Sequence, residues 1–388
     1  MLSSNTSVNT RRHFLKVLST GFAVTATGLL LPSVFASTGQ ALDFRRNAAL
    51  LQLHFNENSL GMSPKALAAA KDAITQFGNR YPDGAVDELK KELAQHVGLP
   101  IEQLILGNGS TEMIGAVVHY ANSLNATVVE PNPTFGDLRS RAQALGMSVV
   151  RVDVDEAFGT NIQAMKKQIN AIKGNVLINL CNPNNPTGTI VDKNELNAWI
   201  TNAPAQHTFL IDEAYHEYAI ANTAYASALS LIKNGQENVI VTRTFSKIYG
   251  MAGMRIGYAM AAPNTAKKID ALSASFNLSI AGITAAIASL QDQAFYKQSL
   301  ESNQQAKTIL TDTLDTLELR YIESNTNFVL HKINSDLASY SQRMRQNQIW
   351  VGRRMTEQDG WNRLSLGTPE EMRQFAQTLR AFREKGWV

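Results

Sequence analysis

The chain has 388 residues, 44% of them hydrophobic and 18% charged, which is typical of a soluble globular protein and not of a disordered or membrane-embedded one. Its net charge of +3 belongs to the first 41 residues, which hold Arg11, Arg12 and Lys16 and no acidic residue, because the other 33 basic residues equal the 33 acidic ones. The body of the chain therefore gives no electrostatic case for a nucleic-acid partner, and its length allows a large core in two lobes.

Residues 1–41 have the sequence pattern of an export signal. The basic stretch TRRHFLK (residues 10–16) precedes an apolar run over residues 17–35, and small residues allow cleavage after Ala36 or Ala41. A retained membrane anchor is the alternative, since the run is about long enough to span a bilayer, although threonine, glycine and proline dilute it. The seven-residue pattern resembles the bacterial twin-arginine signal. This resemblance implies the twin-arginine translocation machinery as a partner and a periplasmic location, or membrane anchoring if the signal is not cleaved.

After this leader, short apolar runs alternate with helical patterns. Seven runs predict strands, at residues 104–107, 126–131, 148–154, 175–180, 207–214, 238–245 and 255–261. Between them lie helix patterns such as TEMIGAVVHYA, with one apolar stripe, and DKNELNAWI, in which Asp192 and Glu195 have capping-box spacing. This order predicts an α/β fold with a mainly parallel sheet covered by helices, followed by a smaller α+β lobe from about residue 290.

Cys181 is the only cysteine, so no intramolecular disulfide can form. It ends the apolar run VLINLC, which indicates a small buried hydrophobic residue; a catalytic thiol is the alternative.

Ligands of an open parallel sheet bind where its strands end, and two of the predicted strands end in unusual loops. In LILGNGSTEMI the strand stops at Gly107, and Ser110 and Thr111 open a helix whose free N–H groups and hydroxyls would bind an anion. A plain helix cap is the alternative. In NLCNPNNPTGTI the dense asparagine and proline mark a rigid loop, where Asn185 is a candidate hydrogen-bond donor if the loop is more than a surface turn.

Two further strands end in charged residues. In FLIDEAYHEY, Asp212 lies at the exit of a buried strand and needs a cationic partner, and Tyr215 could point into the same crevice. TRTFSKIYGMAGMRIGY places Lys247 after an apolar strand and Arg255 eight residues later. A lysine there can have a lowered pKa and act as a nucleophile or Schiff base, and arginine suits a phosphate, although either cation could also be a surface residue.

Together the four segments require a ligand with a phosphate, a ring cation that faces Asp212 and a carbonyl that reacts with Lys247. Pyridoxal 5′-phosphate has all three groups. The phosphate would be bound by Ser110, Thr111, Ser246 and Arg255.

The segments NENSLG, NRYPDG, LGNGSTE, NPNNPTG, DEAYHEY, FSKIYGMAGMRIGY and RLSLGTPEE resemble the class I/II aminotransferases of fold type I, and within them the histidinol-phosphate aminotransferase branch. The resemblance runs from about Leu51 to the C-terminus. It implies a pyridoxal-phosphate enzyme with a seven-stranded large domain over residues 76–285, a small C-terminal domain over 286–388, and an N-terminal arm over 42–75 that joins the small domain.

The resemblance also implies roles for the polar residues. Lys247 would form the internal aldimine and then move the proton between Cα and C4′ in a ping-pong transamination. Asp212 would keep the pyridine nitrogen protonated, and Asn185 and Tyr215 would hold the O3′ oxygen. Gly109 would join the phosphate-binding set of Ser110, Thr111, Ser246 and Arg255.

Three more positions carry family roles. Phe135 stands where the family stacks an aromatic ring on the cofactor, and phenylalanine keeps the stacking face of the commoner tyrosine. Tyr81 would reach the phosphate of the neighbouring subunit, which implies a homodimer with shared sites. Arg363 would bind the substrate α-carboxylate bidentately, which lysine could not do.

Two departures from the family pattern concern the substrate. Leu60 in NENSLG replaces the usual tyrosine, and IWVGRRM inserts Gly352 where the branch places an arginine, displacing Arg353 and Arg354. Both changes weaken a phosphorylated substrate, so Leu60 and Arg353 are expected in a substrate site that disfavours histidinol phosphate. The first expectation is therefore an aminotransferase acting on an amino acid and a 2-oxo acid. A lyase, decarboxylase or cyclase on the same scaffold is the alternative, followed by a non-catalytic binding module.

Overall fold

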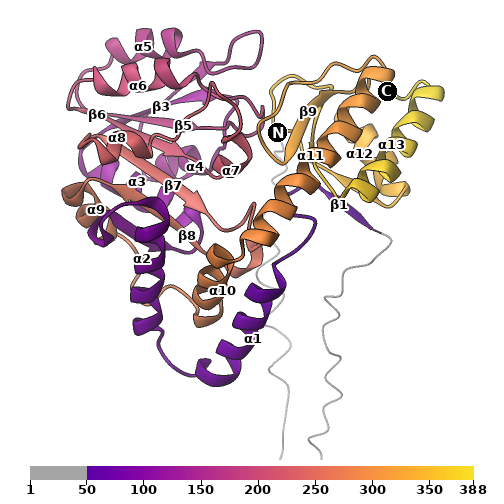
Figure 1. Ribbon diagram of the computed structural model, residues 1–388. Coiled ribbons are helices and arrows are strands. Elements are labelled where there is room, and N and C mark those ends of the chain that lie inside the picture. The colour runs from indigo at the N-terminus through magenta and orange to yellow at the C-terminus, as the bar shows by residue number, and fades with distance from the viewer. Residues whose placement is uncertain (1–49) are drawn as a thin grey trace, which may run out of the picture. The chain divides into compact units, whose positions relative to one another are not determined.

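A seven-stranded sheet forms the centre of the computed structural model, which describes residues 50–388 (Figure 1). The strand order is β2-β8-β7-β6-β5-β3-β4, and β8 alone runs antiparallel to its neighbours. The strands are β2 (Leu104–Gly107), β3 (Thr127–Asn132), β4 (Val149–Asp153), β5 (Val176–Cys181), β6 (His207–Asp212), β7 (Val239–Thr244) and β8 (Gly257–Ala261). All seven predicted strands are present, each within two residues of its expected ends, and the sheet is mainly parallel as predicted.

Helices cover both faces of this sheet (Figure 1). One face packs on α3 (Ser110–Ser123), α4 (Asp137–Ala144) and α9 (Pro263–Asp270). The other packs on α2 (Asp83–Val97), α5 (Ile162–Asn170), α6 (Lys193–Thr201), α8 (Leu229–Lys233) and α10 (Ile280–Gln291). Because side chains alternate along a strand, Ile240 enters the first layer while Val239 and Val241 enter the second. This two-sided burial explains why the central strands read as continuous apolar runs.

Local sequence accounts for the helix starts. The expected apolar stripe of α3 is buried, and Asp192 caps α6 by accepting hydrogen bonds from the N–H groups of Asn194 and Glu195. The last helix, α13 (Pro369–Glu384), begins with a complete capping box of Thr368 and Glu371. Cys181 is buried at the end of β5, as predicted.

A second hydrophobic core belongs to the C-terminal lobe. Here β1 (Leu51–Leu53) pairs in parallel with β10 (Ile349–Val351), and β9 (Phe328–Lys332) pairs antiparallel with β11 (Trp361–Ser365). The pairs pack against α11 (Gln293–Thr316), α12 (Leu337–Gln346) and α13. The start of the described chain thus joins the small lobe through β1, whereas α1 (Pro64–Phe77) packs on α10 (Figure 1).

The two cores meet along α11. Its early residues Tyr296 and Leu300 pack on the large core, and Ala306 and Leu310 belong to the small one. The chain therefore passes from the large core to the small core between residues 300 and 306, whereas the family pattern suggests a domain boundary at residue 285. Among the residues that the structure describes, no helix is both long and apolar enough to cross a membrane. The predicted export signal and its cleavage sites lie outside those residues.

Candidate active site

A cavity of about 460 Å³ lies at the carboxyl ends of the strands. Its wall combines residues that follow β2, β5, β6 and β7 with the arm residues His54, Phe55 and Asn56 and with side chains of the small lobe. Most of the predicted site residues meet here: Ser110, Thr111, Phe135, Asn185, Asp212, Tyr215, Ser246, Lys247, Arg255, Arg353 and Arg363. The volume suits a small organic ligand, and the position matches the general rule for open parallel sheets.

Asp212 forms the acidic wall of the cavity. It ends β6, is only 4% exposed and accepts a hydrogen bond of 3.0 Å from Thr242 Oγ1 on the neighbouring strand. Burial raises the pKa of its carboxyl to about 6, against the opposing effects of the Thr242 hydrogen bond and the Lys247 charge. A carboxylate buried at such a cost is well placed to pair with a ligand cation.

Lys247 follows β7 and faces the same cavity. Its Nζ donates to the carbonyls of Asn56 (3.2 Å) and Phe55 (3.4 Å). Burial, and next the charge of Arg363, lower the pKa of this amine to about 8. The uncharged amine, which is the nucleophilic form, is therefore more abundant near neutral pH than in an ordinary lysine.

The anion end of the cavity is built at the start of α3. Ser110 and Thr111 stand in its first turn, where the helix N-terminus favours negative charge, and Arg255 faces them from the segment before β8. A Cβ on Gly109 would lie 2.5 Å from Arg255 Nη2, and a Cβ on Gly257 would lie 2.3 Å from the Ser110 nitrogen. Gly109 thus supports the site through its lack of a side chain, which lets the arginine close on the helix end.

Arg363 on β11 forms the far wall. It is 7% exposed; Nη1 donates to Asn185 Oδ1 (2.7 Å) and Nη2 donates to the His54 carbonyl (2.8 Å). Its buried Nε has no protein partner. A buried guanidinium with an unused donor in the cavity wall suits a ligand carboxylate.

Tyr215 lines the same cavity as Asp212 and Arg363. Its hydroxyl accepts hydrogen bonds from Asn56 Nδ2 (3.0 Å) and Asn185 Nδ2 (3.4 Å), and burial raises its pKa, so it stays a neutral phenol. Asn56 and Thr242 were not among the predicted site residues. The motif NENSLG contains Asn56 and was the available signal, whereas nothing in the local sequence marks Thr242.

Three predicted site residues, Gly109, Leu60 and Tyr81, do not line the cavity, whereas Gly352 does. Leu60 lines a separate small hollow with Glu57 and Ser299 instead of the cavity, so the expectation that it contributes to the substrate site is not supported by this chain's own contacts. Tyr81 is 77% exposed, outside the cavity, and its ring lies 4.9 Å from that of Phe276. At Gly352 a Cβ would lie 2.2 Å from the Arg363 carbonyl oxygen, so the backbone there excludes a side chain.

A family model described as aminotransferase class I and II matches residues 48–379. The chain belongs to this family. The histidinol-phosphate aminotransferase of Moorella thermoacetica is 33% identical over 334 residues, which cover 85% of each chain. A candidate histidinol-phosphate aminotransferase from Erwinia carotovora atroseptica has a crystal structure that is 39% identical with a TM-score of 0.85, covering 87% of this chain and 97% of that one.

A third relative shows the cofactor directly. The structure of the Sinorhizobium meliloti histidinol-phosphate aminotransferase in complex with pyridoxal-5′-phosphate is 27% identical, with a TM-score of 0.79 over 92% of this chain and 99% of that one. These findings confirm the predicted fold type I architecture, the class I/II aminotransferase assignment and pyridoxal phosphate as cofactor.

The cavity of this aminotransferase fits that cofactor at three points. The glycine-lined start of α3 with Arg255 would hold its phosphate, Asp212 its ring nitrogen, and Lys247 its carbonyl carbon. When bound, the cofactor supplies an electron sink for the pair released when the substrate Cα–H bond breaks. The individual roles of the site residues remain predictions from sequence, now with a shared location.

Proposed function

We propose that this aminotransferase acts on an amino acid with a free α-carboxylate and disfavours histidinol phosphate. The relatives above carry the name histidinol-phosphate aminotransferase, so the proposal separates this chain from them on substrate. The observation that carries it is the backbone at Gly352, which passes so close to the Arg363 carbonyl that an arginine at position 352 could not fit. The branch's phosphate-binding arginine is thereby lost, and Arg353 lines the cavity one residue later.

In this proposal, different residues of the cavity have different roles in transamination. Arg363 binds the α-carboxylate and so orients the Cα–H bond toward Lys247, whose Nζ accepts that proton and returns it at the carbon that receives the amino group. The carbonyls of Phe55 and Asn56 hold this nitrogen when it is not bonded to the cofactor. Asp212 keeps a proton on the ring nitrogen.

A substrate screen tests the proposal. The purified mature enzyme is mixed with single L-amino acids or with histidinol phosphate, and the conversion of bound cofactor to its amine form and the 2-oxo acid product are measured. The best amino acid is expected to have a kcat/KM at least about 10-fold above that of histidinol phosphate, because a missing charged contact discriminates strongly. Histidinol phosphate as the best substrate would refute the proposal, and cofactor bleaching without a 2-oxo acid would indicate a lyase or decarboxylase.

The same enzyme is proposed to work as a homodimer with shared sites. Tyr81 and Phe276, whose rings lie 4.9 Å apart, are more than half exposed, and so are Ile74 and Phe77 near the end of α1, a few residues before Tyr81. Exposed aromatic and aliphatic side chains gathered in this way favour coverage by another protein surface, and the family pattern assigns Tyr81 to the neighbouring subunit's phosphate. A second copy of this chain is the occupant that explains both observations.

Export by the twin-arginine route is the last part of the proposal. The cavity joins His54, Lys247 and Arg363, so a cofactor can be bound only after most of the chain has folded. A route that moves folded proteins suits such an enzyme, which would load its cofactor in the cytoplasm. The mature enzyme is expected in the periplasmic fraction, processed near residue 36 or 41 and with twice the chain mass by light scattering. Replacing Arg11 and Arg12 by lysine should retain it in the cytoplasm; an unprocessed wild-type chain there would refute export.

A further inference from the structure

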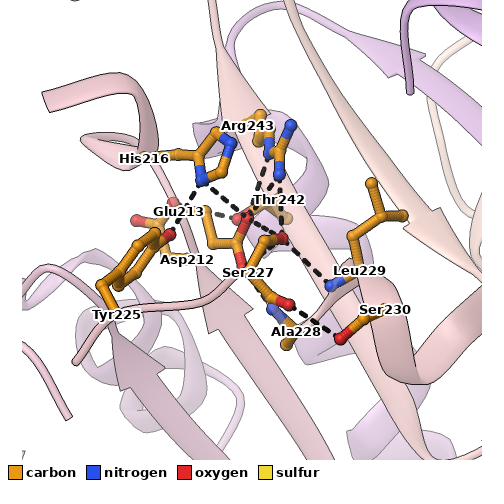
Figure 2. A network of polar contacts seen from close by, with 10 residues as sticks. All are labelled: Asp212, Glu213, His216, Tyr225, Ser227, Ala228, Leu229, Ser230, Thr242 and Arg243. Atoms are coloured by element: carbon orange, nitrogen blue, oxygen red, sulfur yellow. Dashed lines mark hydrogen bonds and ion pairs between the residues drawn. The ribbon is translucent and has the colours of Figure 1, made fainter. Parts of the chain in front are cut away.

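A buried polar network lies directly behind Asp212 (Figure 2). Glu213 accepts two hydrogen bonds at Oε2 from Arg243, from Nε (3.0 Å) and Nη2 (2.9 Å). It also accepts from Ser227 Oγ and, at Oε1, from the Ala228 backbone N–H (2.8 Å). The Glu213 side chain is 0% exposed and that of Arg243 is 6% exposed. None of these residues lines the cavity, so the transamination scheme above does not use them.

The register of the two strands couples this network to the cavity. Asp212 is paired with Thr242 across β6 and β7, and the Glu213 N–H donates to the Thr242 carbonyl (2.8 Å). Successive side chains point to opposite sides of a strand. Asp212 and Thr242 therefore form the hydrogen-bonded pair on the cavity side, and Glu213 and Arg243 form the next pair on the other side. At the end of β6, the contact between Glu213 and Arg243 thus adjoins the contact between Asp212 and Thr242 and can hold it in place.

The charges of the pair also compensate each other next to the cofactor site. Removal of either partner would leave a bare buried charge one residue from Asp212 or Thr242, and a buried charge is little screened by solvent. Two titratable groups beside the pair, His216 and Glu217, are shifted toward their neutral forms. Burial lowers the pKa of His216 to about 4, so this imidazole is neutral, and raises the pKa of Glu217 to about 7. The other titratable groups whose charges interact with the pair include Tyr225, Tyr249, Tyr258, Tyr296 and His96.

We propose that Glu213 and Arg243 are a positioning pair, which keeps the Asp212 carboxylate directed into the cofactor cavity and keeps its surroundings electrically neutral. The inference rests on pyridoxal phosphate being the cofactor. It assigns no contact with substrate or cofactor to either residue. Both act through Asp212 and through the field at the lysine-bound cofactor, where the other charges are Arg363, Glu57, Asp212 and Arg255.

The test compares Glu213→Gln and Arg243→Gln with the wild-type holoenzyme. The readouts are the dissociation constant of pyridoxal phosphate and the pH midpoint of the visible band of the lysine-bound cofactor. Both variants should bind the cofactor about 10-fold more weakly, as removal of partners that orient a ligand generally does. The midpoints should move in opposite directions, by about one pH unit. The bare arginine of Glu213→Gln disfavours the protonated form and lowers the midpoint, and the bare glutamate of Arg243→Gln raises it.

Glu130→Gln is the matched control. Glu130 lies on β3 of the same sheet, its side chain is also 0% exposed, and it accepts a hydrogen bond of 2.8 Å from Arg139 Nη1 on α4, but neither residue lines the cavity. This variant should lose stability like the others and leave the cofactor affinity and midpoint unchanged. If Glu130→Gln moves the midpoint as much as Glu213→Gln does, the effect is a general loss of structure and the proposal fails.

Two further variants decide the case if the single glutamine variants do not fold. Arg243→Lys keeps the charge but loses the two-pronged contact, so it should weaken cofactor binding with an unchanged midpoint. The neutral double variant Glu213→Gln/Arg243→Gln should return the midpoint to that of the wild type. An unmoved cofactor affinity in Arg243→Lys, or a midpoint that stays shifted in the double variant, would overturn the positioning role alone, whereas a wild-type protein without a visible band would overturn the cofactor assignment.

Discussion

Lys247→Ala is expected to abolish the visible band of the bound cofactor and to lower kcat by more than about 10⁴-fold. The substitution removes the amine that bonds to the cofactor and also the group that moves the proton, and proton transfer by a positioned side chain alone contributes up to about 10⁴-fold. The cavity itself should persist, because its anion end and the Asp212 wall come from other segments. Absorbance titration with pyridoxal phosphate and single-turnover kinetics with an amino acid measure both effects.

Lys307→Ala is the matched control for this prediction. Burial lowers the pKa of Lys307, a residue of α11, to about 8 as well. Its Nζ, however, donates to the Ser324 carbonyl, and Lys307 does not line the cavity. A depressed pKa alone therefore does not mark the reactive lysine; its position beside Asp212 and Arg363 does. Loss of the band in Lys307→Ala with retention in Lys247→Ala would reverse the assignment.

The parts of the site that follow strands could be predicted from the sequence. Asp212 is the last residue of a buried strand, Lys247 and Ser110 each come three residues after one, and the carboxyl ends of parallel strands meet at one edge of a sheet. The predicted strands differ from the observed ones by at most two residues, because burial on both faces leaves an uninterrupted apolar pattern. Composition and strand order were thus enough to bring these side chains together.

The residues that complete the site from other segments could not be predicted in this way. His54 and Asn56 reach the cavity because β1 joins the small lobe at β10, a pairing between segments about 300 residues apart in sequence. Thr242 matters only through its register with Asp212. The placement of Leu60 outside the cavity depends on the turn before α1, where Gly61 has a φ of 77°, and single-residue patterns do not specify that geometry. Such contacts depend on tertiary packing, which has no local signature.

Asp212→Asn is expected to make the cofactor-free protein more stable at pH 8 while it impairs catalysis. Burial raises the pKa of Asp212 from 3.8 to about 6, so the folded protein holds a proton between these values that the unfolded chain has released. The free energy of unfolding therefore falls as the pH rises through this window, by about 3 kcal/mol in full above pH 6. Asparagine carries no charge and can still accept the Thr242 hydrogen bond, so it avoids this cost.

Two measurements test whether the buried charge of Asp212 causes this stability difference: its pH dependence and its response to the cofactor. Urea unfolding of the cofactor-free proteins should show the full advantage of Asp212→Asn at pH 8 and about half of it at pH 5, where the wild-type carboxyl is largely protonated. Saturating pyridoxal phosphate should reverse the order, because a ligand stabilises the form that binds it more tightly and only the carboxylate pairs with the ring cation. The variant's kcat should fall at least about 100-fold, since the ring nitrogen loses the partner that keeps it protonated.

Equal free energies of unfolding of the two cofactor-free proteins at every pH would show that the buried charge of Asp212 does not destabilise the fold. With that result, the reason for assigning Asp212 to a ligand cation would be lost.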